Sequence, residues 1–240
     1  MILVLCEESD IAALWAANGL RSRGLPLTVL TGAALASAQR WRHTIRADGT
    51  HAAVRLNGRT LCDRHVRAVF NRLPAVPRAW LSRIGGPDGV YAAQEMYAFY
   101  LSWLHSLSAP ILNPPTPQGL CGNMRHRSAW VALAVRVGLP VHRFSQTSND
   151  DPAATWHLRG NDATRTVFVV GEETIGPPDL VQAHRSACLT FARAAGCPLV
   201  GIDFARGTDN HWRMTTASVI PNIYAGGEAL LDALAAVLAR

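Results

Sequence analysis

The stretch from Gly196 to Asn222 reads GCPLVGIDFARGTDNHWRMTTASVIPN, and it decides how the C-terminal half of the chain folds. Pro198 to Phe204 is a short apolar run that carries Asp203, and Trp212 to Ile220 is a second β-rich run. The segment between them is rich in Gly, Asp and Asn, which favour a hairpin turn. The sequence therefore predicts two antiparallel strands with polar side chains at facing positions, a suitable floor for a metal or phosphate site.

Composition indicates a compact α/β protein. The 240 residues are 49% hydrophobic and 17% charged, which is enough to bury a sizeable core in one large or two small domains. Strand-like and helix-like segments alternate along the chain, as they do in α/β folds. No apolar run reaches the ~18 residues of a membrane span, so no membrane partner is expected. The opening MILVLCEESD lacks a basic n-region and is interpreted as a strand, not a signal peptide.

The charge pattern excludes several chemistries. All 23 basic residues are arginine, and the net charge is +6. Without lysine, the chain cannot use a P-loop lysine, a Schiff-base lysine or a lysine general base, and any phosphate clamp would use guanidinium groups. The arginines are spread along the sequence, so no nucleic-acid partner is expected. The five scattered cysteines favour a cytoplasmic location with reduced thiols.

The N-terminal half is predicted to begin as a β-α-β unit. Its parts are a strand at Met1 to Cys6, a helix at Ser9 to Arg23 and a strand at Leu25 to Leu30. The carboxylates of CEESD stand where a Gly-rich fingerprint would have to approach a phosphate, so an ordinary dinucleotide-binding domain is not expected. The simpler role for these acids is to stabilise the helix N-terminus.

A hairpin is predicted at His51 to Leu61, because Asn57-Gly58 is a strong signal for a tight turn. The next predicted strand, Val66 to Phe70, ends just before Arg72. Ligands of open sheets usually bind at such strand ends, so Arg72 is a candidate binding residue, and bonding of loop carbonyls is its structural alternative. Tyr91 to Ser106 is predicted to be a long, aromatic-rich helix with apolar side chains on most faces.

The C-terminal hairpin resembles the last hairpin of ATP-grasp ligases, which reads G-(I/V)-D-(F/L), a turn, and then E-V-N-x-x-P. In that family the Asp, Glu and Asn hold the magnesium ions that bridge the ATP phosphates. Asp203 matches the Asp, and alignment on Pro221 places Thr216 at the Glu position and Ser218 at the Asn position. A neutral hydroxyl is a far poorer Mg²⁺ ligand than a carboxylate, so the resemblance implies a weakened metal site at these three residues.

Other segments resemble the same family. Hairpin, strand and Asn-Arg-x-Pro, which includes Arg72, follow one another as in the microviridin-type ligases that modify ribosomal peptides. In a predicted helix from Gln118 to Val137, Arg127 stands where the family has a Lys that contacts the nucleotide phosphates; a solvated helix face is the alternative. RTVFVVGEETIG places Arg165 where the family often has an Arg that helps to bind the transferring phosphoryl group. The resemblance thus implies that Arg72 and Arg127 bind the cofactor and that Arg165 is catalytic.

The resemblance implies an α/β, ATP-grasp-like fold. A Rossmann-like domain would cover residues 1–113, and a reduced ATP-grasp α+β portion would cover residues 114–240. The boundary follows a predicted strand at Pro110 to Asn113 and the proline-rich NPPTPQG. Residues 142–163 are polar and irregular where the family has a longer subdomain with a lid, so a lid that excludes water is expected to be short or absent.

Two functions follow from the resemblance. The first is a degenerate descendant of ATP-dependent carboxylate-amine ligases that serves as a binding or accessory subunit in peptide or metabolite modification, beside a partner enzyme or as a homodimer. It would need no cofactor, and Asp203 would pair with Arg165 or Arg127 in place of a metal. The second is an active minimal ligase, which would use ATP and Mg²⁺ to form an acyl phosphate on a peptide or small-metabolite carboxylate. A third alternative is a binding domain unrelated to nucleotides.

Overall fold

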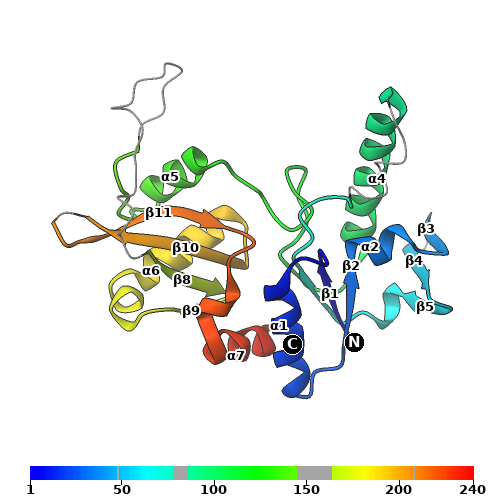
Figure 1. Ribbon diagram of the computed structural model, residues 1–240, viewed down its shortest axis with the longest axis horizontal. Coiled ribbons are helices and arrows are strands. Elements are labelled where there is room, and N and C mark those ends of the chain that lie inside the picture. The colour runs from blue at the N-terminus through cyan, green and yellow to red at the C-terminus, as the bar shows by residue number, and fades with distance from the viewer. Residues whose placement is uncertain (48, 78–85, 145–163, 208) are drawn as a thin grey trace. The chain divides into compact units, whose positions relative to one another are not determined.

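A computed structural model describes residues 1–47, 49–77, 86–144, 164–207 and 209–240 (Figure 1). These residues form two compact units, the first made of residues 1–123 with 234–240 and the second of residues 124–233. The expected functional division into residues 1–113 and 114–240 remains a prediction. No helix in the described part of the chain is sufficiently long and apolar to cross a membrane.

The first unit is built on a parallel sheet with strand order β2-β1-β6-β7. The bounds are β1 Ile2–Cys6, β2 Leu27–Thr31, β6 Ala68–Asn71 and β7 Ile111–Leu112. Strand β1 is fully buried, as expected for a central parallel strand between two covered faces. Helix α1 (Ile11–Ser22) joins β1 to β2, which confirms the predicted β-α-β unit. The short helix α2 (Gly32–Ala36) follows β2 directly.

A second sheet in this unit is antiparallel, with strand order β3-β4-β5. Its strands are β3 Arg40–Arg46, β4 Gly49–Leu56 and β5 Arg59–Cys62. Asn57 and Gly58 join β4 to β5 with φ angles of 47° and 76°. Two successive positive φ angles are what a tight hairpin requires, so the predicted hairpin is confirmed. Strand β3 was not predicted.

Helix α4 (Gly86–Ser106) packs one face against this second sheet. The Trp41 ring of β3 meets Phe99, Tyr100 and Trp103 of α4 edge to face, with ring centroids 4.8 to 4.9 Å apart. Tyr100 and Trp103 are buried, whereas Tyr91 near the start of the helix is 65% exposed. The aromatic side chains of α4 are therefore core on one face and solvent-exposed on another.

The second unit is built on an antiparallel sheet with strand order β11-β10-β8-β9. Its strands are β8 Arg165–Val170, β9 Glu173–Ile175, β10 Leu199–Arg206 and β11 Trp212–Ser218. Helices α5 Arg127–Arg136 and α6 Pro178–Ala195 belong to this unit, and α7 Gly227–Leu238 begins in it. Helix α6 packs on one face of the sheet. Its His184 ring stacks there on the Phe204 ring of β10, with the two ring centroids 5.3 Å apart.

The predicted helix from Gln118 to Val137 is wrong in its first half. The helix begins at Arg127, after His126, whose ring nitrogen accepts a hydrogen bond from the Ser128 amide and caps the first turn. Gly122 has a φ angle of 106°, which right-handed helices do not contain. Residues 118–126 therefore form a connection, and Arg127 lies at the very start of α5.

Candidate functional site

The hairpin of β10 and β11 aligns the three residues that sequence analysis assigned to a metal site. Asp203 lies opposite Thr216, and Gly201 lies opposite Ser218. Residues that face each other across antiparallel strands project to the same side, so Asp203, Thr216 and Ser218 share one face of the sheet. On the other side of β10, Thr166 of β8 also lies opposite Asp203. Asp203, Thr166, Thr216 and Ser218 are together called the Asp203 face below.

Asp203 is held by threonine hydroxyls. Its Oδ1 accepts a hydrogen bond of 2.6 Å from Thr166 Oγ1. Its backbone carbonyl accepts one of 3.2 Å from Thr215 Oγ1, where a β-bulge shifts the register after Asp203. Burial raises the pKa of the Asp203 carboxyl, and the Thr166 hydrogen bond opposes that rise. Within the described residues Asp203 has no ion pair, so the expected pairing with Arg165 or Arg127 is wrong.

The rest of the face is closed by packing and by local bonds. Ser218 Oγ accepts a hydrogen bond from the Ile220 amide at 3.1 Å. A Cβ added to Gly201 would lie 2.5 Å from the Pro221 Cβ, so Gly201 allows Pro221 to lie close above the sheet. The position opposite Ser218 therefore contributes no side chain, and the Ser218 hydroxyl is engaged with its own loop.

Arg165 points away from the Asp203 face. Neighbouring residues of a strand project to opposite faces, so Arg165 starts from the face opposite Thr166. Its guanidinium lies 3.7 Å from the carboxylate of Asp179 in the first turn of α6. The same guanidinium stands 5.3 Å from the ring centroid of Trp212, which Arg206 also approaches at 4.9 Å. The sheet therefore does not bring Arg165 and Asp203 together.

Arg127 lies nearer to the Asp203 hairpin, but it binds protein groups. Its Nε donates a hydrogen bond of 3.0 Å to the carbonyl of Thr215, the bulged residue of β11. The guanidinium stands over the Phe144 ring at 5.7 Å. Burial lowers the pKa of Arg127, although an arginine remains protonated at neutral pH. Its contacts fasten the start of α5 to the bulge.

Arg72 pairs with the carboxylate of Asp10, a contact of the structural kind that sequence analysis set beside a binding role. Its Nε and Nη2 donate to the two carboxylate oxygens of Asp10 at 2.8 and 3.2 Å. The Arg72 side chain is 3% exposed and the Asp10 side chain 14%. Asp10 is also the N-cap of α1, because its Oδ1 accepts from the Ala13 amide at 2.9 Å. This is the local role expected for the acids of CEESD, realised by one of them.

The donor set of the Asp203 face does not fit a pair of magnesium ions. Hard divalent cations are held by several oxygen ligands, of which carboxylates are the strongest. Asp203 is the only carboxylate in the sequences of β10 and β11, and neutral hydroxyls occupy the facing positions. No group of three His, Cys, Asp or Glu that could hold a metal occurs among the described residues.

The first unit carries a basic surface that was not predicted from the sequence. On one face of the second sheet lie Arg40 and Arg42 of β3 with Arg55 of β4, all exposed. Trp41, on the opposite face, packs into the core. The alternation in RWRHTIR is a period-two signal that could have revealed this strand. The dense basic surface comes from strand pairing, which brings together arginines that are dispersed in sequence.

Comparison with known proteins identifies the fold. No family model matches the chain, and no curated protein matches its sequence. The macrocyclase MdnC of Microcystis aeruginosa MRC, bound with precursor peptide MdnA, superposes with a TM-score of 0.75 at 10% identity over 100% of both chains. The ATP-grasp ligase PsnB, complexed with minimal precursor, Mg and ADP, superposes with a TM-score of 0.71 at 16% identity over 100% of this chain and 98% of its own.

A third solved structure agrees with these two. The RiPP-associated ATP-grasp ligase of Chryseobacterium gregarium, in complex with ADP and a leader and core peptide, has a TM-score of 0.71 at 10% identity over 99% of this chain and 96% of its own. Identities this low establish the fold and leave the chemistry to be argued from residues. The mixed α/β architecture with one parallel and two antiparallel sheets is thus the fold of the ATP-grasp peptide ligases.

Proposed function

We propose that this protein descends from ATP-dependent carboxylate-amine ligases and acts as a degenerate binding or accessory subunit in peptide modification. The observation that supports this most is the composition of the Asp203 face. Thr166, Thr216 and Ser218 surround a single carboxylate, and one of these hydroxyls already donates to it. An acyl-phosphate ligase needs cations to neutralise the phosphate charge that develops during transfer. The Asp203 face offers a single carboxylate to hold such a cation, and that carboxylate already accepts a hydrogen bond from Thr166.

The arginines support the same proposal. A phosphate clamp requires guanidinium groups that converge on one point. Arg72 is buried against Asp10, and Arg127 is bonded to a main-chain carbonyl. Arg165 pairs with Asp179 from the opposite side of the sheet. Each arginine that the family resemblance assigned to ATP binding or catalysis therefore contacts another group of this chain.

A peptide is the ligand that we propose for this subunit. The solved structures of similar fold include complexes with precursor peptides, as their descriptions state. A chain that keeps this fold and loses the metal ligands would keep the ability to bind a peptide, alone or as a homodimer, while a partner enzyme performs the chemistry. A small-metabolite carboxylate is the other ligand class that the family resemblance implies.

The alternative is an active minimal ligase that uses ATP and Mg²⁺. It is favoured by one observation, that Asp203 retains its carboxylate at the position of the family's Asp on β10. Calorimetric titration with ATP and Mg²⁺, together with an assay of ADP release in the presence of a carboxylate pool and an amine, separates the two functions. We expect no turnover. Micromolar ATP affinity with ADP release that Asp203→Asn abolishes would establish the ligase instead.

A further inference from the structure

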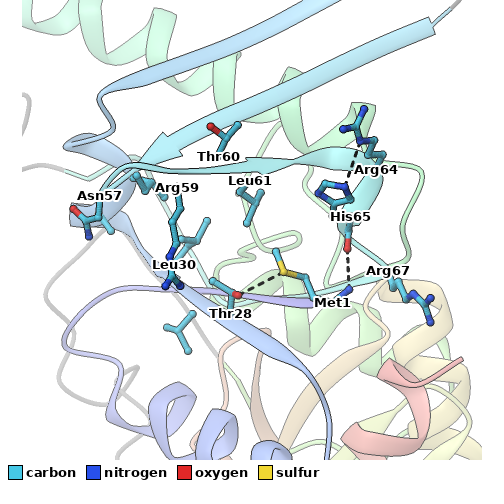
Figure 2. A pocket seen from close by; sticks show the side chains of 13 residues that line it. Met1, Thr28, Leu30, Asn57, Arg59, Thr60, Leu61, Arg64, His65 and Arg67 are labelled. Atoms are coloured by element: carbon cyan, nitrogen blue, oxygen red, sulfur yellow. Dashed lines mark hydrogen bonds between the residues drawn. The ribbon is translucent and has the colours of Figure 1, made fainter.

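A large pocket lies in the first unit, between two strands that are each at the edge of a sheet. Its volume is about 970 Å³, within the size range of ligand-binding pockets. One wall is β2, the edge strand of the parallel sheet, and the other is β5, the edge strand of the antiparallel sheet. Figure 2 shows Thr28 and Leu30 on one side and Thr60 and Leu61 on the other. This space is called the β2–β5 pocket below.

The β2–β5 pocket combines an apolar floor with cationic walls. Leucine and valine side chains line the floor, and Arg59, Arg64 and Arg67 line the rim. All three arginines are exposed. The guanidinium groups of Arg59 and Arg67 form no hydrogen bond or ion pair with any residue that the structure describes, and the Arg64 side chain donates to the His65 ring at 3.3 Å. The described residues of the lining include no Asp or Glu, so none of them compensates the charge of these guanidinium groups within the pocket.

The main-chain nitrogen of Met1 lies at the same wall, where it donates a hydrogen bond of 2.8 Å to the carbonyl of His65 (Figure 2). Asp63 is the carboxylate nearest in sequence to these arginines. Its two oxygens accept hydrogen bonds from the main-chain amides of Ala52 and Arg64 at 2.8 and 2.6 Å. Cations gathered along a low-dielectric cleft raise the local concentration of anions.

We propose that the β2–β5 pocket binds an extended acidic peptide, whose carboxylates pair with Arg59, Arg64 and Arg67 and whose alternate apolar side chains enter the floor. An edge strand offers unpaired main-chain groups to an added strand, and pockets for alternate side chains give such pairing its specificity. Arginine binds carboxylates through two parallel hydrogen bonds. Both edge strands are short, so the matching peptide segment has about five residues at ~3.3 Å each.

A peptide fits this pocket better than a nucleic acid. Single-stranded nucleic acids are bound by stacking of bases on aromatic rings, combined with a basic groove. The described residues that line the β2–β5 pocket include no Trp, Tyr or Phe, whereas they include Val29, Leu30 and Leu61. The site lies wholly in the first unit and does not depend on the Asp203 face, so it goes beyond the proposed function and can stand or fall separately.

The test uses fluorescence anisotropy with the full chain and a labelled synthetic peptide of alternating Glu and Val. The same peptide with Gln for Glu is the neutral comparison, and a peptide with alternate backbone nitrogens methylated blocks main-chain pairing. The test variant combines Arg59→Gln with Arg67→Gln. The matched control combines Arg136→Gln with Arg240→Gln, two exposed arginines elsewhere that remove the same charge. Circular dichroism verifies that both variants are folded.

We expect the wild type and the control to bind the Glu/Val peptide equally, and the Arg59/Arg67 variant to bind it at least about tenfold more weakly. The Gln/Val and methylated peptides should bind more weakly to the wild type, and added salt should weaken the Glu/Val complex. The proposal is overturned if the wild type does not bind the Glu/Val peptide, if test and control variants lose equal affinity, or if methylation has no effect. It is also overturned if an oligothymidylate of equal charge binds more tightly than the peptide with the same dependence on Arg59 and Arg67.

Discussion

Replacing Arg72 by Met tests whether this arginine is part of the fold or of a nucleotide site. The substitution keeps an unbranched apolar stem and removes the guanidinium that donates two hydrogen bonds to Asp10. Removing one partner of a buried ion pair costs about 3–5 kcal/mol, because the other charge is left uncompensated. Asp10 retains 14% exposure and its bond to the Ala13 amide, so we expect a loss near the lower limit, about 3 kcal/mol.

Urea denaturation followed by circular dichroism measures this loss. Arg21→Met is the matched control, since Arg21 is an exposed arginine of α1 that bonds Asn18, and its cost should stay within about 0.5 kcal/mol. Asp10→Asn combined with Arg72→Met should be less destabilised than the sum of the two single changes, because neither charge is then left alone. A loss below about 1 kcal/mol for Arg72→Met would refute the structural role. A loss of ATP affinity with unchanged stability would assign Arg72 to the cofactor.

Three further predictions concern the Asp203 face. Thr166→Val should destabilise the protein by about 1.5–3 kcal/mol at neutral pH, since it removes a hydrogen bond to a charged group, and it should raise the pKa of Asp203 further, which carboxyl NMR can follow. Asp203→Asn should stabilise the protein at neutral pH. The pKa of the Asp203 carboxyl is higher in the folded than in the unfolded protein, so the ionised carboxylate opposes folding once the pH exceeds the folded pKa. The gain in stability should therefore vanish when denaturation is repeated at pH values below the unfolded pKa. A gain that grows on acidification would contradict this sign. Gly201→Ala should cost about 1–3 kcal/mol in thermal unfolding, because its Cβ would stand 2.5 Å from the Pro221 Cβ; an unchanged melting temperature would show that Pro221 can move.

Local signals in the sequence were sufficient for most of the fold. The hairpin at Asn57-Gly58 and the strands of the Asp203 hairpin follow from turn residues and from β-rich runs, which act over a few positions. The helix at residues 118–137 was extended too far because its apolar pattern continues into a connection. The cap that begins the helix, a His126 ring bonded to the Ser128 amide, is not among the usual N-cap residues.

The surroundings of each candidate side chain could not be predicted, because they depend on strand register. Side chains alternate between the two faces along β8, and this alternation places Thr166, and not Arg165, on the Asp203 face. A one-residue shift in register would exchange the two side chains. Arg72 likewise acquires its partner from a residue 62 positions away. The pocket between β2 and β5 requires two separate sheets to be in place. Arg59, Arg64 and Arg67 lie close together in sequence, but their position opposite β2 depends on how the sheets fold.

Titration with Mn²⁺, followed by electron paramagnetic resonance, measures directly whether the Asp203 face holds a hard cation. The restored variant combines Thr216→Glu and Ser218→Asn, which returns a carboxylate and an amide to the positions facing β10, and Asp203→Asn is the loss control. With an ATP analogue present, we expect the wild type to bind Mn²⁺ no better than Asp203→Asn, and the restored variant to bind at least about tenfold more tightly than either. Tight Mn²⁺ binding by the wild type that Asp203→Asn abolishes, with no gain in the restored variant, would contradict a degenerate site and support an active ligase.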